Sequence, residues 1–278
     1  MSGERKLFKD GPIIGQLTQG SIINGCVAEI LPGEVVYGCV ITPRCALSHD
    51  GKVETIHYLP LIPFQRWFDL IAKPIIKQEW KNDCRNQLNT RFQNAKIGTN
   101  IMDATLSYED MVRLCEEKIT KEKDKKSIQQ LLDAYFEHDS EAFNKYISEG
   151  KGAVDAQIKR LVENRHASYY LLESWEKEQT PSHYVIMLRD VRRIQLQIAE
   201  KISEGLLEED LPFIDTAHND LFVSIHKDTF YYVETEITSP FIEHILQAFV
   251  QNFSKVGVDD IAKETKTFLI NSIKKEWP

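Results

Sequence analysis

The pattern of apolar and polar positions near the start of the chain is typical of β-strands. The segments "GSIINGCVAEI" and "EVVYGCVIT" are rich in β-branched and apolar residues, and the Pro-Gly turn of "LPGE" separates them. A third strand is predicted in "VETIHYLPLIP", where Pro60 and Pro63 favour an edge position or the end of the strand. Three short strands with glycine-containing turns indicate a small β-barrel.

The pattern then changes to the period of α-helices. In "FQRWFDLIAKPIIKQEWKNDCRNQLNTRF" apolar side chains recur at intervals of three and four between Trp67 and Phe92. Ser107 and Asp110 match a capping box at the start of the next predicted helix. That helix and three further ones are predicted in "SYEDMVRLCEEKI", "SIQQLLDAYFEH", "SEAFNKYI" and "AVDAQIKRLVENRHASYYLLESW".

Strand patterns return after residue 182, in "HYVIMLRDVRRI" and "DLFVSIHKDTFYYVETEI". The segment "SPFIEHILQAFVQNFSKVG" predicts a helix with Ser239 as its N-cap, Pro240 in its first position and Gly257 after its end. A last helix is predicted over residues 259–276. Because the first three strands cannot cover their own apolar faces and the later strands lack partners, we expect one α+β fold. The later strands would close the barrel, and the helical block would be an insertion.

This interpretation divides the chain into three parts. Residues 1–66 form the first part of the β-barrel, residues 67–182 the helical insertion, and residues 183–278 the closing strands and C-terminal helices. The alternative is a β domain followed by an α domain, with a small C-terminal α+β unit.

Composition and charge limit the possible functions. The formal net charge is -8, which speaks against a general nucleic-acid binder held by phosphate contacts, although a local basic groove is possible. The chain has no run near the roughly 18 apolar residues that span a bilayer, and its start has no apolar signal sequence. We therefore expect a cytoplasmic protein without membrane contact, in which the five cysteines are reduced.

The N-terminal strands resemble the opening of the PemK/MazF-like toxins, which have an SH3-like barrel. The matching positions are Gly20, Ile22, Thr42, Pro43, Leu59, Pro60 and Ile62. This resemblance implies that the barrel is SH3-like. Together with the pattern described above, we therefore expect an α+β fold built as a small SH3-like β-barrel with a large helical insertion and two C-terminal helices. The resemblance also implies possible ribonuclease chemistry, with RNA as the substrate.

A second resemblance links the chain to uncharacterised bacterial proteins of phage-defence or toxin-antitoxin-like loci. It is carried near the C-terminus by Ser239, Pro240, Glu243, His244, Gln247, Phe249, Phe253 and Gly257. The resemblance implies a role in such a system and assigns no chemistry.

The candidate catalytic residues lie in and after the second predicted strand. The toxin chemistry requires an arginine before this strand and a hydroxyl beyond it. Thr42 supplies the hydroxyl, and Arg44 would have to replace the arginine, whose usual place is taken by Val36–Gly38. His49 or Asp50 would transfer the proton. The alternative is that these residues form only a strand end and a polar turn.

Possible metal ligands do not form a convincing set, so we predict no metal and no cofactor. Cys45 and His49 could combine with Cys39 or His57, but a structural zinc site usually shows a C-x-x-C pair on each side. The cysteines are better explained as buried apolar residues, and a turn centred on Pro32 and Gly33 would place Cys26 opposite Cys39.

Charged residues in the last third of the chain provide two further candidates. Glu234 and Glu236 have alternate spacing and with His226 could bind a divalent ion, or they could form a solvent-facing strand surface. The second candidate is a basic group of three residues, Arg189, Arg192 and Arg193. This group could bind a phosphate or the acidic groups of a partner, or it could be a solvated strand edge.

Two hypotheses about function follow. The first is a non-catalytic interaction or sensor component of a bacterial phage-defence or toxin-antitoxin-like system, with a protein partner encoded nearby. The second is a divergent PemK/MazF-type endoribonuclease. A homo-oligomer is possible under either hypothesis. The aromatic residues of the helical block are either interface anchors or core. The set is Trp67, Trp80, Tyr135, Phe136, Tyr169, Tyr170 and Trp175.

Overall fold

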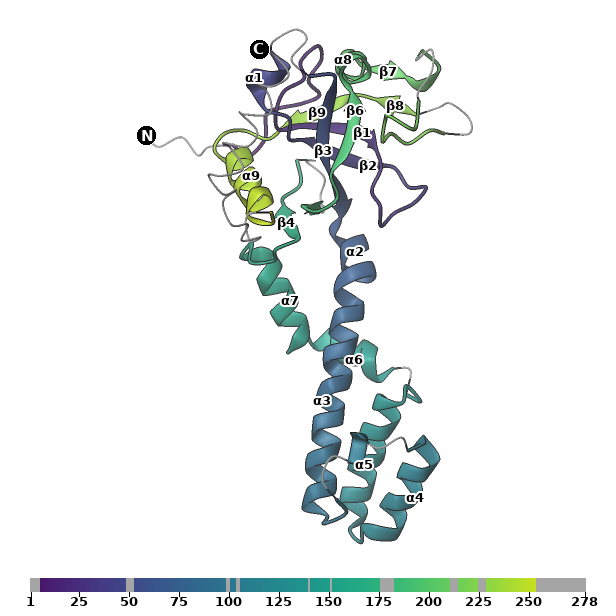
Figure 1. The fold of residues 1–278 in the computed structure, drawn as a ribbon. Helices are drawn as coiled ribbons and strands as arrows, with labels where there is room; N and C mark the ends of the chain where they lie inside the picture. Colours follow the sequence, from purple (N-terminus) through teal and green to yellow (C-terminus); the bar gives the residue numbers. More distant parts are fainter. Residues whose placement is uncertain are drawn as a thin grey trace, which may run out of the picture.

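The computed structural model has an α+β fold, which confirms the fold class that the sequence predicts (Figure 1). An antiparallel sheet forms its body, and a helical arm extends from one side of this sheet. The structure describes residues 6–48, 53–98, 101–103, 106–139, 141–150, 152–175, 183–210, 215–224 and 229–253.

Seven strands of the described chain form one antiparallel sheet. Its order is β4-β5-β3-β2-β1-β9, and β6 also pairs with β3. The strands are β1 (Ser21–Cys26), β2 (Val36–Val40), β3 (Thr55–Pro63), β4 (Tyr169–Leu172), β5 (Tyr184–Met187), β6 (Arg192–Gln195) and β9 (Val233–Glu236). Because β4 and β9 lie at the two ends of this order, the sheet is open, and the described strands do not close into the predicted barrel.

Strands from both ends of the chain share this sheet. The N-terminal strands β1, β2 and β3 lie at its centre; β5 and β6 extend it beside β3, and β9 extends it beside β1. The helices between β3 and β4 therefore interrupt the sheet in sequence. The N-terminal segment covers the outer edge of β9, since Lys9 N donates to the Glu236 carbonyl at 2.9 Å and Ile13 N donates to the Val233 carbonyl at 3.0 Å.

Alternate residues of the central strands pack on opposite faces of the sheet. Ile23, Val40 and Tyr58 belong to a core shared with the base of the arm and with α8 (Leu196–Glu204). Their neighbours Ile22, Cys39 and Leu59 belong to a core covered by α9 (Phe241–Gln251). Both faces are buried, which explains why these strands read as nearly continuous apolar runs.

The prediction that Cys26 lies opposite Cys39 in the first hairpin is wrong. Cys39 pairs with Ile22, and Cys26 pairs with Val36 after a register shift. The connection between the two strands is therefore longer than a two-residue turn centred on Pro32 and Gly33. Burial raises the pKa of the Cys39 thiol to about 12 and raises that of Cys26 as well, so both stay protonated at neutral pH.

The arm consists of helices that leave the sheet after β3 and return to β4 (Figure 1). Its tip has an apolar core of its own, which includes Leu88, Phe92, Met111 and Leu132. The predicted capping box is confirmed, since Ser107 accepts from the backbone N–H of Asp110 at the start of α4. The helices are α2 (Phe64–Trp67), α3 (Lys73–Asn94), α4 (Tyr108–Lys118), α5 (Glu122–Tyr135), α6 (Ala142–Glu149) and α7 (Ala153–Val162), with a short 3-10 turn at Ile101–Asp103.

A π-helical turn, Phe68–Ala72, joins α2 to α3 at the base of the arm. Pro74 has no N–H, so the hydrogen bond to the carbonyl four residues earlier is missing at this position. Lys73 N instead donates to the carbonyl of Phe68, five residues earlier. The predicted helix is thus continuous through its proline, with a widened turn before it.

The remaining elements lie around the sheet. They are α1 (Arg44–Leu47), β7 (Leu206–Leu207), a 3-10 turn (Glu208–Asp210) and β8 (Phe230–Tyr231), and β7 pairs with β8. Helix α9 begins one residue later than predicted, with Pro240 as its N-cap. Gly257 and the helix predicted over residues 259–276 lie outside the described residues. Within the described part of the chain, no helix has the length and apolar character needed to span a membrane.

Candidate functional site

Thr42 is part of the connection between β2 and β3. Its side chain is 5% exposed, and its Oγ1 accepts from the backbone N–H of His57 at 2.7 Å. The preceding Ile41 N donates to the His57 carbonyl at 2.9 Å. The Thr42 hydroxyl therefore continues the hydrogen bonding of the strand pair, whereas a catalytic hydroxyl would face a substrate.

We expect Thr42→Val to lower the free energy of unfolding by about 1 kcal/mol, because the His57 N–H would lose its acceptor in a partly buried position. Urea denaturation followed by circular dichroism measures this change. Thr42→Ser, which retains the oxygen, is the control and should restore most of the lost stability. Equal effects of the two substitutions would contradict this role of the hydroxyl.

Arg44 lies beside a buried carboxylate from the far end of the chain. Its guanidinium is 4.0 Å from Oε1 of Glu236, whose side chain is only 4% exposed. Lys9 Nζ donates to Oε2 of the same carboxylate at 2.5 Å. Two cations thus balance one buried anion, as expected for a carboxylate removed from water. Glu236 was a predicted metal candidate, and Lys9 was not predicted, because nothing in the sequence indicates that the N-terminal segment lies along β9.

The other predicted acid-base and metal residues fall only partly within the described chain. His49, Asp50 and His226 lie outside the described residues. The register of β9 against β1 shifts around Glu234, and no metal-binding group of three or more His, Cys, Asp or Glu residues is found where the structure describes side chains. The pair of Glu234 and Glu236 therefore does not form a solvent-facing row, since Glu236 is buried.

The three arginines of the predicted basic group make different contacts. Arg192 has carboxylates around it: Asp190 accepts from its Nε, and Glu29 and Asp220 lie 3.6 and 3.9 Å from its guanidinium nitrogens. Arg193 donates to the carbonyl of Ala217 at 2.8 Å. These contacts hold the turn around residues 215–220 against β6.

Arg189 lies apart from this network. Its Nε is 3.4 Å from the Asn252 side-chain oxygen at the end of α9. It is exposed, whereas Arg192 is partly buried. The structure therefore does not bring the three arginines to one phosphate-sized site.

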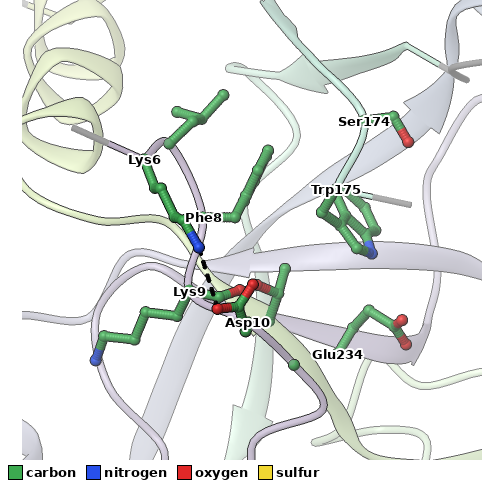
Figure 2. A pocket seen from close by; sticks show the side chains of 10 residues that line it. Lys6, Phe8, Lys9, Asp10, Ser174, Trp175 and Glu234 are labelled. Atoms are coloured by element: carbon green, nitrogen blue, oxygen red, sulfur yellow. Dashed lines mark hydrogen bonds and ion pairs between the residues drawn. The ribbon is translucent and has the colours of Figure 1, made fainter. Parts of the chain in front are cut away.

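A pocket of about 530 Å³ shares Lys9 with the cluster of Arg44, Lys9 and Glu236. Figure 2 shows this pocket. Three segments distant in sequence form it: the N-terminal segment, the residues after β4, and β9. The close approach of the first and the last depends on Gly11, where a Cβ would lie 1.8 Å from the Glu234 carbonyl oxygen. The lining residues are Lys6, Leu7, Phe8, Lys9, Asp10, Gly11, Ser174, Trp175, Glu234 and Thr235.

An aromatic cluster fixes the wall of this pocket. Trp175 stacks on Tyr184 at a ring-centroid distance of 4.6 Å, and Tyr37 and Phe8 contact it edge to face at 4.9 and 5.6 Å. Trp175 was predicted as an interface or core aromatic of the helical block. The structure places it at the sheet, and no local sequence signal indicates that it lines a pocket together with Glu234.

Comparisons of the chain with models of protein families, with curated proteins and with solved structures find no match.

Proposed function

We propose that the protein is a non-catalytic interaction or sensor component and that its helical arm contacts a protein partner. The observation that carries this proposal is the arm itself, which extends from the sheet and has a separate apolar core at its tip (Figure 1). The base of the arm shares a core with the sheet, whereas its tip adds surface without adding to that core. Surface that extends in this way is suited to contact with another macromolecule.

Ionic contacts link α3 to the end of α5 in the arm. Lys77 of α3 donates to Glu137, just after α5, at 2.5 Å, and Lys81 pairs with the other oxygen of the same carboxylate. The hydrogen bonds from Lys77 and Lys81 lower the pKa of Glu137 to about 2. A fixed arm can bind a partner without first losing conformational freedom.

The biological setting is a further part of the proposal. The resemblance of the α9 segment to proteins of bacterial phage-defence or toxin-antitoxin-like loci supports a partner encoded near this gene. We also propose a relationship to PemK/MazF-like toxins, and its support is the resemblance of the N-terminal strands to the opening of that family. The buried Thr42 hydroxyl and the ion-paired Arg44 support a role without catalysis.

A divergent endoribonuclease is the second candidate. The observation that favours it is the proximity of Arg44 to Glu236, since a cation for a phosphorane and a carboxylate for proton transfer would lie 4.0 Å apart. RNA would then be the substrate.

We expect the protein to form a stable complex with the product of a neighbouring gene, detectable by light scattering after gel filtration. Ile75→Asp on the arm should weaken this complex about tenfold or more, because Ile75 is a 38% exposed apolar residue of α3. Val191→Asp is the matched control, because Val191 is 40% exposed and lies between β5 and β6. An equal loss for both variants would contradict docking through the arm.

Incubation with total RNA distinguishes the second candidate. The interaction proposal requires that the purified protein leaves the RNA intact. Cleavage that is lost in both Arg44→Ala and Thr42→Ala would overturn it in favour of the endoribonuclease.

A further inference from the structure

The sheet has two outer edges, and the described chain covers only one of them. Along β9 the N-terminal segment pairs with the strand, as the bond from Lys9 N to the Glu236 carbonyl shows. At the other end of the sheet β4 pairs with β5, and no described segment pairs with the other side of β4. An uncovered edge strand presents unpaired N–H and C=O groups to an extended chain that reaches it.

The hydrogen-bond pattern shows which groups of β4 face outward. Leu188 N donates to the Ser168 carbonyl at 3.0 Å, so this pair is bonded across the junction of β4 and β5. Bonded and non-bonded pairs alternate in an antiparallel ladder, so Tyr170 bonds to Ile186 and Leu171 does not bond to β5. The N–H and C=O of Leu171 therefore point away from the sheet.

The other side of β5 gives the same result. Phe64 N donates to the His183 carbonyl at 2.8 Å, so the odd-numbered residues of β5 bond toward β3. The even-numbered Ile186 is left to bond toward β4, opposite Tyr170. Two separate hydrogen bonds thus agree on the outward direction of the Leu171 main chain.

A pocket of about 790 Å³ lies along this edge, and we call it the edge pocket. Leu171 is part of its lining, together with Val162 at the end of α7 and Phe241 at the start of α9. Val162 is 58% exposed, so its apolar surface is free to contact a ligand. The edge pocket thus combines outward main-chain groups with apolar walls.

The walls of the edge pocket restrict what can reach β4. Helix α7 contacts β4, and α9 is joined to it by the Tyr170 hydroxyl and His244 Nδ1, which are 2.9 Å apart. Figure 1 shows β4 between these two helices. A second copy of the chain would offer an edge set between its own two helices, so two such edges would not meet. A single extended segment needs only the usual spacing of about 4.8 Å from β4.

We propose that the edge pocket binds an extended peptide segment of a protein partner, which adds to β4 as an antiparallel strand. The main chain of this segment bonds to the N–H and C=O of Leu171, and an apolar side chain contacts Val162. Antiparallel addition continues the arrangement of the sheet, in which β4 and β5 are also antiparallel. The N-terminal segment along β9 shows that an extended chain can cover an edge of this sheet.

Charge at the edge pocket further defines the segment. Glu173 lies just after β4 in the lining, is exposed and has no ion pair with a described residue. Lys6 also lines the edge pocket, but it pairs with Asp10 at 3.3 Å. The N-terminal end of an antiparallel segment lies beside the C-terminal end of β4, so a lysine or arginine at that end of the peptide would meet Glu173.

The inference goes beyond the proposed docking role of the arm. The edge pocket lies at the sheet, and no residue of α3–α6 lines it. Loss of the complex in Ile75→Asp and loss of peptide binding in an edge-pocket variant are separate results. Either proposal can therefore fail without the other.

The test uses a phage-displayed library of random heptapeptides, selected on the full chain and followed by calorimetry with the selected peptides. We expect alternating β-branched or aromatic residues and a lysine or arginine near the N-terminal end. Leu171→Pro should weaken binding about tenfold or more, because it removes the outward N–H and no bond to β5. Leu171→Val keeps this N–H, is the matched control and should bind nearly normally.

Two further pairs of variants test the wall and the charge. Val162→Asp should weaken binding about tenfold, and Val250→Asp, at a 56% exposed position of α9 outside the lining, should not. Glu173→Gln should weaken binding about twofold to fivefold and remove the preference for a basic N-terminal end. Glu209→Gln, at an exposed position away from the lining, is the control for this charge.

Hydrogen exchange separates strand addition from other ways of binding. The Leu171 amide should exchange more slowly with peptide bound, whereas the Tyr170 amide, already bonded to β5, should change little. Selection of no peptide, equal binding by Leu171→Pro and Leu171→Val, or unchanged exchange at Leu171 would each overturn the proposal. A dimer that light scattering detects and Leu171→Pro abolishes would overturn it in favour of a second copy.

Discussion

Replacing Trp67 with alanine is expected to lower the free energy of unfolding by about 3–5 kcal/mol. Trp67 is fully buried at the point where the arm leaves the sheet. Its ring lies 5.8 Å from that of Phe64 and 5.7 Å from that of Tyr169, which belongs to β4. Alanine would leave a cavity between the two connections of the arm to the sheet. Urea denaturation followed by circular dichroism gives the free energy.

Trp67→Phe is the matched control for this substitution. The indole Nε1 of Trp67 is buried without a partner, so phenylalanine removes an unpaired donor while it keeps an aromatic ring. We expect this variant to lose clearly less stability than Trp67→Ala. An unchanged denaturation midpoint in Trp67→Ala would show that the aromatic contacts at the base of the arm do not couple it to the sheet.

Features that depend on local sequence patterns were predictable. The apolar positions of α3, such as Ile76, Leu88 and Phe92, are buried because helical spacing places them on one face. The capping box at Ser107 depends on residues three positions apart, and the β-branched segments became β1, β2 and β3. In each case the residues that determine the structure are close neighbours in the chain.

Features that depend on distant contacts were not predictable. The hairpin register cannot be obtained from the Pro-Gly pair, because the register shift near Cys26 and the length of the connection both change which residues face each other. Glu236 looks like a surface residue in an alternating strand. It is buried because the N-terminal segment, with Lys9, pairs along its edge.

The same reasoning applies to the candidate sites. Thr42, Arg44 and the predicted arginines are close in sequence to residues of suitable chemistry, but their partners come from His57, Glu236 and the turn around residues 215–220. These partners already form hydrogen bonds or ion pairs with side chains that, from the sequence alone, would be expected to be free to bind a substrate or a ligand. The pocket of Figure 2 also depends on distant contacts, since its lining residues come from the N-terminal segment, the residues after β4, and β9.

Replacing Gly38 with alanine is expected to lower the free energy of unfolding by about 3 kcal/mol, the upper part of the usual range for overpacking. Gly38 lies in β2, where a Cβ would be 2.6 Å from Sγ of Cys26 and 2.6 Å from Cδ2 of Tyr58. Both neighbours are fully buried. Tyr58 is also fixed by its hydroxyl, which donates to the Asp220 carbonyl at 2.5 Å, so its ring cannot move away without breaking that contact.

The register of the first hairpin depends on the same glycine, because the Cys26 side chain occupies the space above it. Thermal and urea denaturation of Gly38→Ala measure the cost. Gly98→Ala is the control, because its Cβ would meet only the end of the Ile101 side chain, at 3.1 Å, and that side chain can shift. Cys26→Ala in the Gly38→Ala background should recover part of the lost stability, because it removes one of the two clashes. If the double variant recovers no stability, the loss in Gly38→Ala comes entirely from the clash with Tyr58 and from the hydrogen bonds of its hydroxyl.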